Sequence, residues 1–297
     1  MKKVIFLGGT SRSGSTLLHL ILANDPKAMA LGEIHSLFRP TKKHHFEELI
    51  KLKKNLIWSK ILKAGKKQLY PNVIKFFPDI DVFVDSSKDP FWFKYHEKVK
   101  HFDYDIKHVL IYKTPAELAK SFIKRGKETE WIRTYKHYHK KYFSLIKIFV
   151  TISYKDLIND DHALQKLCEA LGIKYFDKKK QYWEHEQTHF FGSSSVKAKD
   201  SHNAKRQLDD QKRHDIKYDG LEDENIKDYV INALKGNPQI SQIKEKLFIR
   251  NVLNRSKDFN DKNIGYNKLF LGLISIKKYF KNKYRYYYPE DLFNKRL

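Results

Sequence analysis

Cysteine is almost absent from this chain, with Cys168 the only one in 297 residues. One cysteine cannot form an internal disulfide or a thiolate metal site. Cys168 lies in the apolar-periodic stretch 164–171, where a buried thiol is the ordinary outcome. This cysteine usage is typical of a reducing compartment, and we expect a cytoplasmic protein.

Long apolar runs are absent as well. No stretch approaches the about 20 residues that a membrane-spanning helix needs. The first apolar run, Val4–Leu7, is too short for the apolar core of a signal peptide. The sequence therefore predicts a soluble protein with no transmembrane segment.

Acidic residues are scarce relative to basic ones: 35 Asp and Glu stand against 59 Lys and Arg, a formal net charge of +24. Such an excess favours an anionic partner, which nucleic acid, anionic lipid, polysaccharide or a phosphorylated small molecule would each satisfy. The lysines are spread in pairs along the chain, as a lysine-rich proteome also produces, and no groove-reading motif accompanies them. We therefore expect an anionic small-molecule, glycan or lipid ligand and no nucleic acid.

Short apolar runs alternate with amphipathic stretches, and 41% of the residues are apolar, enough for one large domain with a core or for two small ones. Buried strands are predicted at 4–7, 82–84, 109–112 and 148–152, and helices at 15–23, 116–125, 130–146 and 162–171, the last ending at Gly172. This alternation predicts an α/β fold with a central, mainly parallel sheet flanked by helices.

The polar and basic segments suggest how the chain is divided. Residues 1–235 are predicted to form one domain, with a basic helical insertion at about 41–80 and a polar lid at about 190–220. Residues 236–297, rich in Lys and Tyr, are predicted to form a basic aromatic helical extension packed on that domain. Peripheral contact of this extension with an anionic membrane or glycan is the alternative.

A glycine-rich turn separates the first predicted strand from the first helix. It reads Gly8-Gly9-Thr10-Ser11-Arg12-Ser13-Gly14-Ser15-Thr16. Glycines let successive amides converge on an anion, and the helix that follows adds unsatisfied N–H groups. The spacing matches a nucleotide P-loop, except that Ser15 stands where the lysine should be. Arg12 is the only cation, and a planar guanidinium suits a terminal tetrahedral oxyanion group.

The stretch Arg12–Leu18 resembles the 5′-phosphosulfate loop of sulfotransferases that use 3′-phosphoadenosine 5′-phosphosulfate (PAPS), in the branch of tyrosylprotein and many bacterial sulfotransferases. The resemblance covers about residues 1–235 and implies a P-loop-type three-layer fold with PAPS as co-substrate. In that branch a glutamate of a Gly-Glu pair, 21 residues after the loop arginine, is the catalytic base. Glu33 occupies this position. His35 is the alternative base, because other branches use histidine.

Further family elements recur in order. The lysine of a Lys-Asp-Pro element corresponds to Lys88, which the resemblance places at the bridging oxygen of the donor. The 3′-phosphate residues correspond to Lys113, Ser121 and Arg125, and Lys113 replaces the usual arginine, which loses a bidentate contact. Nucleotide contacts are thus expected from Arg12, Ser13, Gly14, Ser15, Thr16, Leu17, Lys113, Ser121, Arg125 and Tyr154, and from Ser194, Ser195 and Lys197 of the lid.

The predicted activity is transfer of a sulfuryl group from PAPS to a hydroxyl or amine of a carbohydrate, lipid or peptide, by in-line attack with Glu33 as base. His35 and Arg39 flank the base and fit an anionic acceptor. No metal is expected, because the pairs His44-His45 and His137-x-His139 lack ligand spacing and partners.

Two other functions stay open. A P-loop kinase or nucleotide hydrolase would use Val82–Asp85 as a Walker B strand and Thr16 as a magnesium ligand, but the missing loop lysine counts against it. A non-catalytic module that binds polyanions would explain the charge alone.

Overall fold

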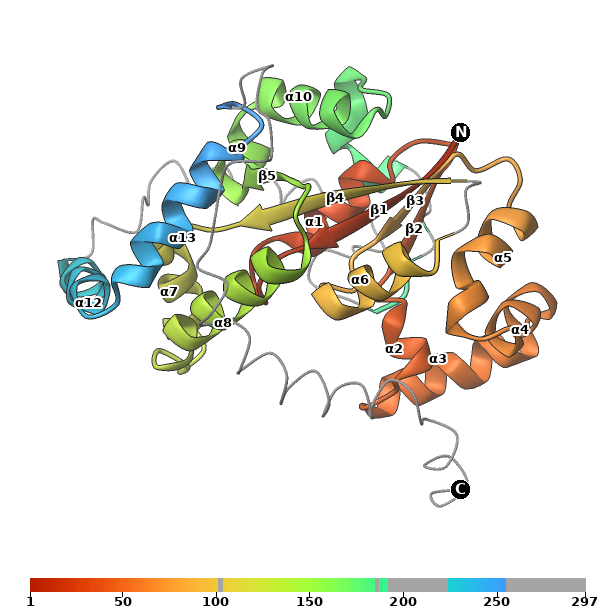
Figure 1. Ribbon diagram of the computed structural model, residues 1–297, viewed down its shortest axis with the longest axis horizontal. Coiled ribbons are helices and arrows are strands. Elements are labelled where there is room, and N and C mark those ends of the chain that lie inside the picture. Colours follow the sequence, from red (N-terminus) through yellow and green to blue (C-terminus); the bar gives the residue numbers. More distant parts are fainter. Residues whose placement is uncertain (101–103, 185–186, 188, 192–223, 255–297) are drawn as a thin grey trace. The chain divides into compact units, whose positions relative to one another are not determined.

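Five parallel strands form one sheet in the residues that this computed structural model describes, namely 1–100, 104–184, 187, 189–191 and 224–254 (Figure 1). The strands are β1 (Lys2–Gly8), β2 (Ala28–Gly32), β3 (Val82–Asp85), β4 (Tyr104–Tyr112) and β5 (Val150–Ser153), in the order β2-β3-β1-β4-β5. Each hydrogen-bonded pair is parallel, with β1 between β3 and β4. The predicted α/β fold with a parallel sheet is confirmed.

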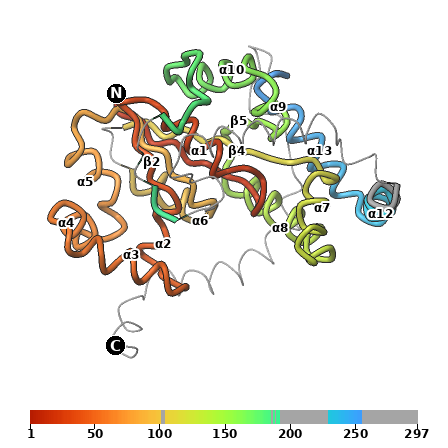
Figure 2. The backbone as a smooth tube through the Cα atoms, turned by 180° about the vertical axis from the view of Figure 1, so that it is seen from behind, coloured from red at the N-terminus to blue at the C-terminus, as the bar shows by residue number. Residues whose placement is uncertain are grey.

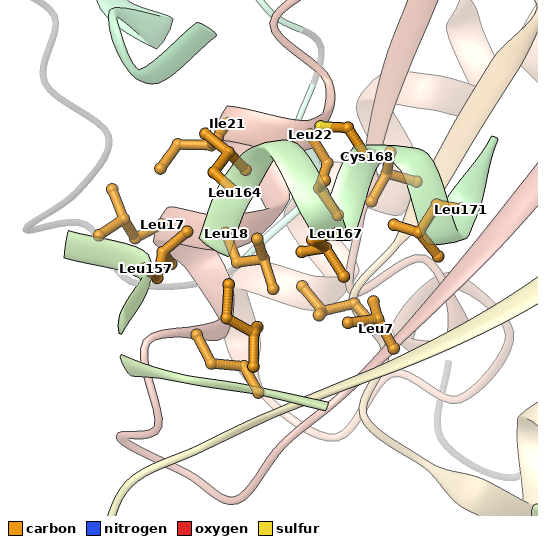
Figure 3. Close-up of a cluster of buried hydrophobic side chains, with 14 of the residues drawn as sticks. Leu7, Leu17, Leu18, Ile21, Leu22, Leu157, Leu164, Leu167, Cys168 and Leu171 are labelled. Carbon is orange, nitrogen blue, oxygen red and sulfur yellow. The ribbon is translucent and has the colours of Figure 1, made fainter. Parts of the chain in front are cut away.

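Successive residues of β1 pack on opposite faces of the sheet, because side chains alternate along a strand. Ile5 and Leu7 join the cluster that α1 (Ser15–Leu22) and α10 (Asp161–Leu171) complete, and Figure 3 shows Leu18 of α1 close to Leu167 of α10. Truncating one such leucine to alanine costs about 2–5 kcal/mol of folding stability. The packing of these leucines therefore holds α1 against this face of the sheet.

The opposite face of the sheet is aromatic. Phe6 of β1 stacks on Phe93 with 4.7 Å between ring centroids and meets Tyr70 edge-on at 5.5 Å. These rings come from α6 (Pro90–Lys98) and α5 (Leu69–Phe76), and α8 (Glu130–Leu145) covers the same face. The sheet therefore has helices on both faces, which gives three layers (Figures 1 and 2).

Residues 43–76 form helices between β2 and β3. They are α3 (Lys43–Lys54), α4 (Leu56–Lys63), η1 (Lys66–Gln68) and α5, preceded by the short α2 (His35–Phe38). Both views place α3 and α4 beyond the β2 edge of the sheet (Figures 1 and 2). The helical segment thus lies next to the residues that follow β2.

Four helices lie toward the opposite edge of the sheet (Figures 1 and 2). They are α7 (Pro115–Ile123), which follows β4, α9 (Tyr154–Asn159), which follows β5, and the later α12 (Glu224–Lys235) and α13 (Pro238–Ile249). The short helices η2 (Asp177–Lys180) and η3 (Tyr182–Glu184) precede the lid region. Past α13, the backbone N–H of Thr151 donates to the Arg250 carbonyl at 2.9 Å. α13 follows the predicted boundary at 235, and residues 255–297 of the predicted extension lie outside the described residues.

The predicted strands and helices overlap observed elements, and Gly172 ends α10 in the left-handed conformation with φ 64°. β2 was not predicted, because Ala-Met-Ala-Leu-Gly lacks the β-branched residues that mark a strand. α6 and α9 were not predicted either. No helix in the described ranges is both long and apolar enough to cross a membrane.

Candidate active site

The carboxyl ends of the five strands gather predicted site residues at one edge of the sheet. Parallel strands place the loops that follow them along the same edge, where ligands of α/β sheets bind. The residues are the Arg12 loop after β1, Glu33 after β2, Lys88 after β3, Lys113 after β4 and Tyr154 after β5. Residues separated by more than a hundred positions therefore share one edge.

The glycine-rich turn after β1 has the backbone of an anion-binding loop. Arg12 has φ 71° and Gly14, the residue before α1, has φ 93°, both in the left-handed region. Only glycine adopts this region without strain, so Arg12 carries a cost of about 1–2 kcal/mol. Gly9 donates its N–H to the hydroxyl of Tyr138 at 2.7 Å, a contact from α8 that was not predicted. The loop is therefore fixed before any ligand arrives.

The predicted nucleotide residue Tyr154 packs against this loop, and the predicted cations Lys113 and Arg125 contact Tyr154 and Ser121 respectively. A Cβ on Gly14 would lie 2.3 Å from the Tyr154 ring, so the ring packs directly on the turn. The Lys113 ammonium lies 4.1 Å from the centroid of the same ring. Arg125 donates to the Ser121 carbonyl at 2.7 Å.

Arg125 lies close enough to Arg12 for their positive charges to interact. Burial lowers the pKa of Arg12, and the nearby charge of Arg125 lowers it further. Arg12 and Arg125 are both exposed, and their like charges repel one another; a ligand with several negative charges would relieve that repulsion. The loop and the residues around Tyr154 are suited to a polyanion.

Glu33 and Lys88 form an ion pair with 2.6 Å between Oε1 and Nζ. Burial opposes ionisation of Glu33, but the charge and hydrogen bond of Lys88, followed by the charges of His35 and Lys42, outweigh it and lower the pKa of Glu33. The carboxylate is therefore ionised at neutral pH, as a proton acceptor must be.

The loop that carries Lys88 is held on both sides of it. Buried Asp85 accepts hydrogen bonds from the Ser87 N–H at 2.6 Å and from the Tyr70 hydroxyl, and burial raises its pKa. Asp89 caps α6 and pairs with Lys141 at 3.0 Å. Between these anchors Lys88 has φ 58°, a conformation that side chains other than glycine rarely adopt. Backbone strain of this kind is found at functional sites, where the surrounding structure holds it.

A glycine variant is usually less stable than an alanine variant, but at Lys88 we expect the glycine variant to be the more stable. Alanine keeps the strain at φ 58°, whereas glycine relieves about 1–2 kcal/mol and loses about 0.5–1 kcal/mol to chain entropy. We expect Lys88→Gly to unfold at higher urea than Lys88→Ala. Lys88→Ala as the more stable variant would show that the strain is absent. Both variants remove the ammonium group and should lose activity alike.

His35 lies beside the ion pair. Its backbone N–H donates to Ser87 Oγ at 3.2 Å, which ties the start of α2 to the Lys88 loop. Burial lowers the pKa of the imidazole, so the ring is neutral at pH 7 and is able to accept a proton. His35 thus remains a geometrically acceptable alternative to Glu33.

The segment 189–191 holds Glu33 in a way that the sequence did not predict. The Glu33 N–H donates to the Phe190 carbonyl at 2.7 Å. Gly32 has φ 64°, and a Cβ there would lie 1.9 Å from the Phe190 carbonyl oxygen. The Phe190 ring meets Trp58 of α4 edge-on at 4.8 Å, so the segment joins Glu33 to the inserted helices. The only sequence signal was Gly32 itself, because the strand that it ends was not predicted.

Three predicted lid residues, Ser194, Ser195 and Lys197, lie outside the described residues. Within the described ranges, no group of three or more His, Cys, Asp or Glu side chains is placed to hold a metal ion. Within the described ranges, the predicted nucleotide contacts therefore come from the loops and helices that follow the five strands.

Comparisons with known proteins find likeness in structure. No protein-family model and no curated protein matches the chain. The sulfotransferase domain of the Synechococcus PCC 7002 olefin synthase matches with a TM-score of 0.50 and 18% identity, over 69% of this chain and 86% of that domain. The sulfotransferase domain of the curacin biosynthetic pathway (TM-score 0.46, 18% identity, 63% and 79% covered) and a sulfotransferase from Alicyclobacillus acidocaldarius (0.32, 14%, 59% and 82%) match less well. At these identities the first likeness establishes the fold alone: the chain has an α/β fold like that of sulfotransferase domains.

Proposed function

We propose that this protein is a sulfotransferase that moves a sulfuryl group from PAPS to a hydroxyl or amine acceptor. The observation that carries the proposal is the 2.6 Å contact between Glu33 and Lys88, at the same sheet edge as the Arg12 loop. A base, a cation and an anion-binding loop are the groups that sulfuryl transfer needs. The sulfotransferase-like fold supports the same conclusion.

The donor would be held by its two anionic ends. The amides at the start of α1 and the guanidinium of Arg12 bind the phosphosulfate, since a helix amino terminus and an arginine both favour tetrahedral oxyanions. Lys113, Ser121 and Arg125 bind the 3′-phosphate, and Tyr154 lies between the two groups of cations. This division explains why Arg12 on one side and Lys113 with Arg125 on the other occupy one edge of the sheet.

In the transfer step Glu33 takes the proton of the acceptor hydroxyl or amine as that atom bonds to sulfur. The bond from sulfur to the bridging oxygen breaks, and Lys88 stabilises the negative charge that develops on that oxygen. Lys88 must then leave Glu33 for the donor. Once Lys88 has moved, burial is the largest remaining influence on Glu33 and raises its pKa, which makes it a stronger base.

The acceptor is proposed to carry a negative charge of its own, on a carbohydrate, a lipid or another small molecule. Lys42 and Arg39 come from the chain between α1 and α3, and Lys66 from η1. Beyond the effect of burial, the charge of Lys42 lowers the pKa of Glu33, and that of Arg39 lowers the pKa values of His35 and Lys66. Cations near the base would attract a carboxylate, phosphate or sulfate group on the acceptor.

Binding of adenosine 3′,5′-diphosphate (3′,5′-ADP), the desulfated donor, tests the proposal. At about a hundredfold excess over Kd the nucleotide should stabilise the protein by about 2.7 kcal/mol. For a domain of this size the melting temperature should rise by about 5–10 °C. Thermal unfolding with and without magnesium measures this shift, which should not need the metal. The Lys113→Ala variant should lose most of the preference for 3′,5′-ADP over adenosine 5′-phosphate.

A larger shift with magnesium-ATP than with 3′,5′-ADP would assign the loop to a kinase or nucleotide hydrolase instead. Steeply salt-dependent polyanion binding without PAPS turnover would favour a binding module. An unchanged nucleotide preference in Lys113→Ala would remove Lys113 from the 3′-phosphate site and leave the rest of the proposal standing.

A further inference from the structure

Three large apolar side chains lie exposed on the inserted helices: Phe46 is 45% exposed, Ile50 57% and Leu56 72%. Phe46 and Ile50 are four residues apart on α3, so they share one side of the helix. The buried side of α3 consists of His45, Leu49 and Leu52. Phe46 and Ile50 thus form an exposed apolar strip on α3, additional to the side that packs on the protein, and Leu56 is exposed at the start of α4.

Lysines surround this strip. Residues 41–64 contain seven lysines and two glutamates, which gives a formal charge of 7 − 2 = +5. The lysines are exposed: Lys42, Lys43, Lys51, Lys53, Lys54, Lys60 and Lys63. We call the three apolar residues and these lysines the α3–α4 face. A helix with exposed apolar residues and a lysine-rich polar side is typical of segments that lie in a membrane interface.

We propose that the α3–α4 face binds the surface of a membrane that contains anionic lipids. Phe46, Ile50 and Leu56 would enter the boundary between headgroups and acyl chains, and the lysines would contact lipid phosphates. Charge argues against a second copy of this chain as the occupant, because two faces of +5 would repel each other. The aliphatic side chains of Ile50 and Leu56 also fit acyl chains better than they fit stacked bases.

The helices that carry this face are anchored independently of it. Leu49 and Leu52 of α3, and Trp58 and Ile61 of α4, are buried beneath it. Substitutions at exposed positions should therefore leave the fold intact. The buried side of α3 also brings His45 near enough to Glu33 for their charges to interact. Membrane binding through this face would bring the candidate active site close to the lipid surface.

Co-sedimentation of the full chain with vesicles tests the proposal without any reference to sulfuryl transfer. We expect binding to increase about tenfold or more when about one third of the phosphatidylcholine is replaced by phosphatidylglycerol. The double variant Phe46→Ser/Ile50→Ser should reduce binding to the anionic vesicles about tenfold.

A matched control is available in Ile148 and Phe248, which are 70% and 61% exposed elsewhere on the protein. The variant Ile148→Ser/Phe248→Ser removes the same two side-chain types and should bind vesicles like the wild type. Melting temperatures of both double variants show whether each is folded. If Phe46→Ser/Ile50→Ser is unfolded, the single variant Ile50→Ser takes its place.

Four outcomes would overturn the proposal. They are no binding to either vesicle, equal binding to neutral and anionic vesicles, equal loss in the two double variants, and no loss in Phe46→Ser/Ile50→Ser. Sedimentation velocity without lipid adds a further test. A dimer that only Phe46→Ser/Ile50→Ser abolishes would assign the face to a second copy and contradict a membrane role.

Discussion

Glu33→Gln is expected to lower sulfuryl transfer by about 10²- to 10⁴-fold, the usual contribution of a general base. Glutamine keeps the size of the side chain but cannot take a proton from the acceptor. Binding of 3′,5′-ADP should stay within about twofold of the wild type, because the proposed nucleotide contacts lie in other loops. Labelled sulfate transferred from PAPS, first screened over carbohydrates, lipids and phenols, measures the rate with the best acceptor.

The exposed Glu169 on α10 provides a matched control, since Glu169→Gln makes the same chemical change far from the ion pair. Transfer by this variant should equal that of the wild type. Unchanged transfer by Glu33→Gln would exclude Glu33 as the base. A loss confined to His35→Asn would then make His35 the base in its place.

The pH dependence of the reaction should report the exchange of Lys88 between Glu33 and the donor. In the free protein the pKa of Glu33 is lowered, so kcat/KM should stay constant as the pH falls to about 5. In the proposed complex Lys88 would contact the donor, and the acid limb of kcat should lie at higher pH. The ion pair stabilises the fold above the unfolded pKa of Glu33, and this stability should be lost as the pH falls through the lowered folded value.

Gly32→Ala should have the largest effect on stability among single methyl additions in the site. Alanine at φ 64° costs about 1–2 kcal/mol, and its Cβ would lie 1.9 Å from the Phe190 carbonyl oxygen, which adds about 1–3 kcal/mol of overpacking. We expect a loss of about 3 kcal/mol, measured by urea unfolding. Because the Phe190 carbonyl accepts the Glu33 N–H, transfer should fall as well.

Gly126→Ala is a control that shows how much of the stability loss in Gly32→Ala comes from backbone strain and how much from overpacking. Gly126 has φ 63°, and a Cβ there would meet no atom within 4 Å. This variant should lose only about 1 kcal/mol, the cost of the backbone conformation. Equal losses in the two variants would mean that the contact between Gly32 and Phe190 does not form in solution.

Sequence reasoning located the parts of the site that depend on local chemistry. The turn at Gly9–Thr16 was recognisable because glycines, an arginine and a following helix occur together, and β1 and β4 because their apolar runs are continuous. β2 was missed although it carries Glu33, because an edge strand of five residues rich in alanine has no local signal. The position of Glu33 came from a family spacing rather than from an expected strand.

Contacts between segments that are distant in the sequence could not be predicted from local sequence patterns. Nothing near Lys88 in the sequence indicates φ 58°, since its anchor Asp85 is held by Tyr70 of α5 and Trp92 of α6. The bond from Glu33 to Phe190 spans 157 residues and depends on how the chain returns to the sheet. Such contacts are set by the tertiary fold, and their only trace in the sequence is a glycine that leaves room for a neighbouring backbone.

The contact of Phe190 with Gly32 and Glu33 also affects whether another strand can add to the sheet. Strands at the margins of a sheet expose unpaired amide groups that recruit other chains into aggregates. Here Arg250–Val252 hydrogen-bonds with Thr151 along β5, and Phe190 blocks the carboxyl end of β2 at the other margin. The described edge strands are therefore partly occupied at these two points, which disfavours the addition of another strand there.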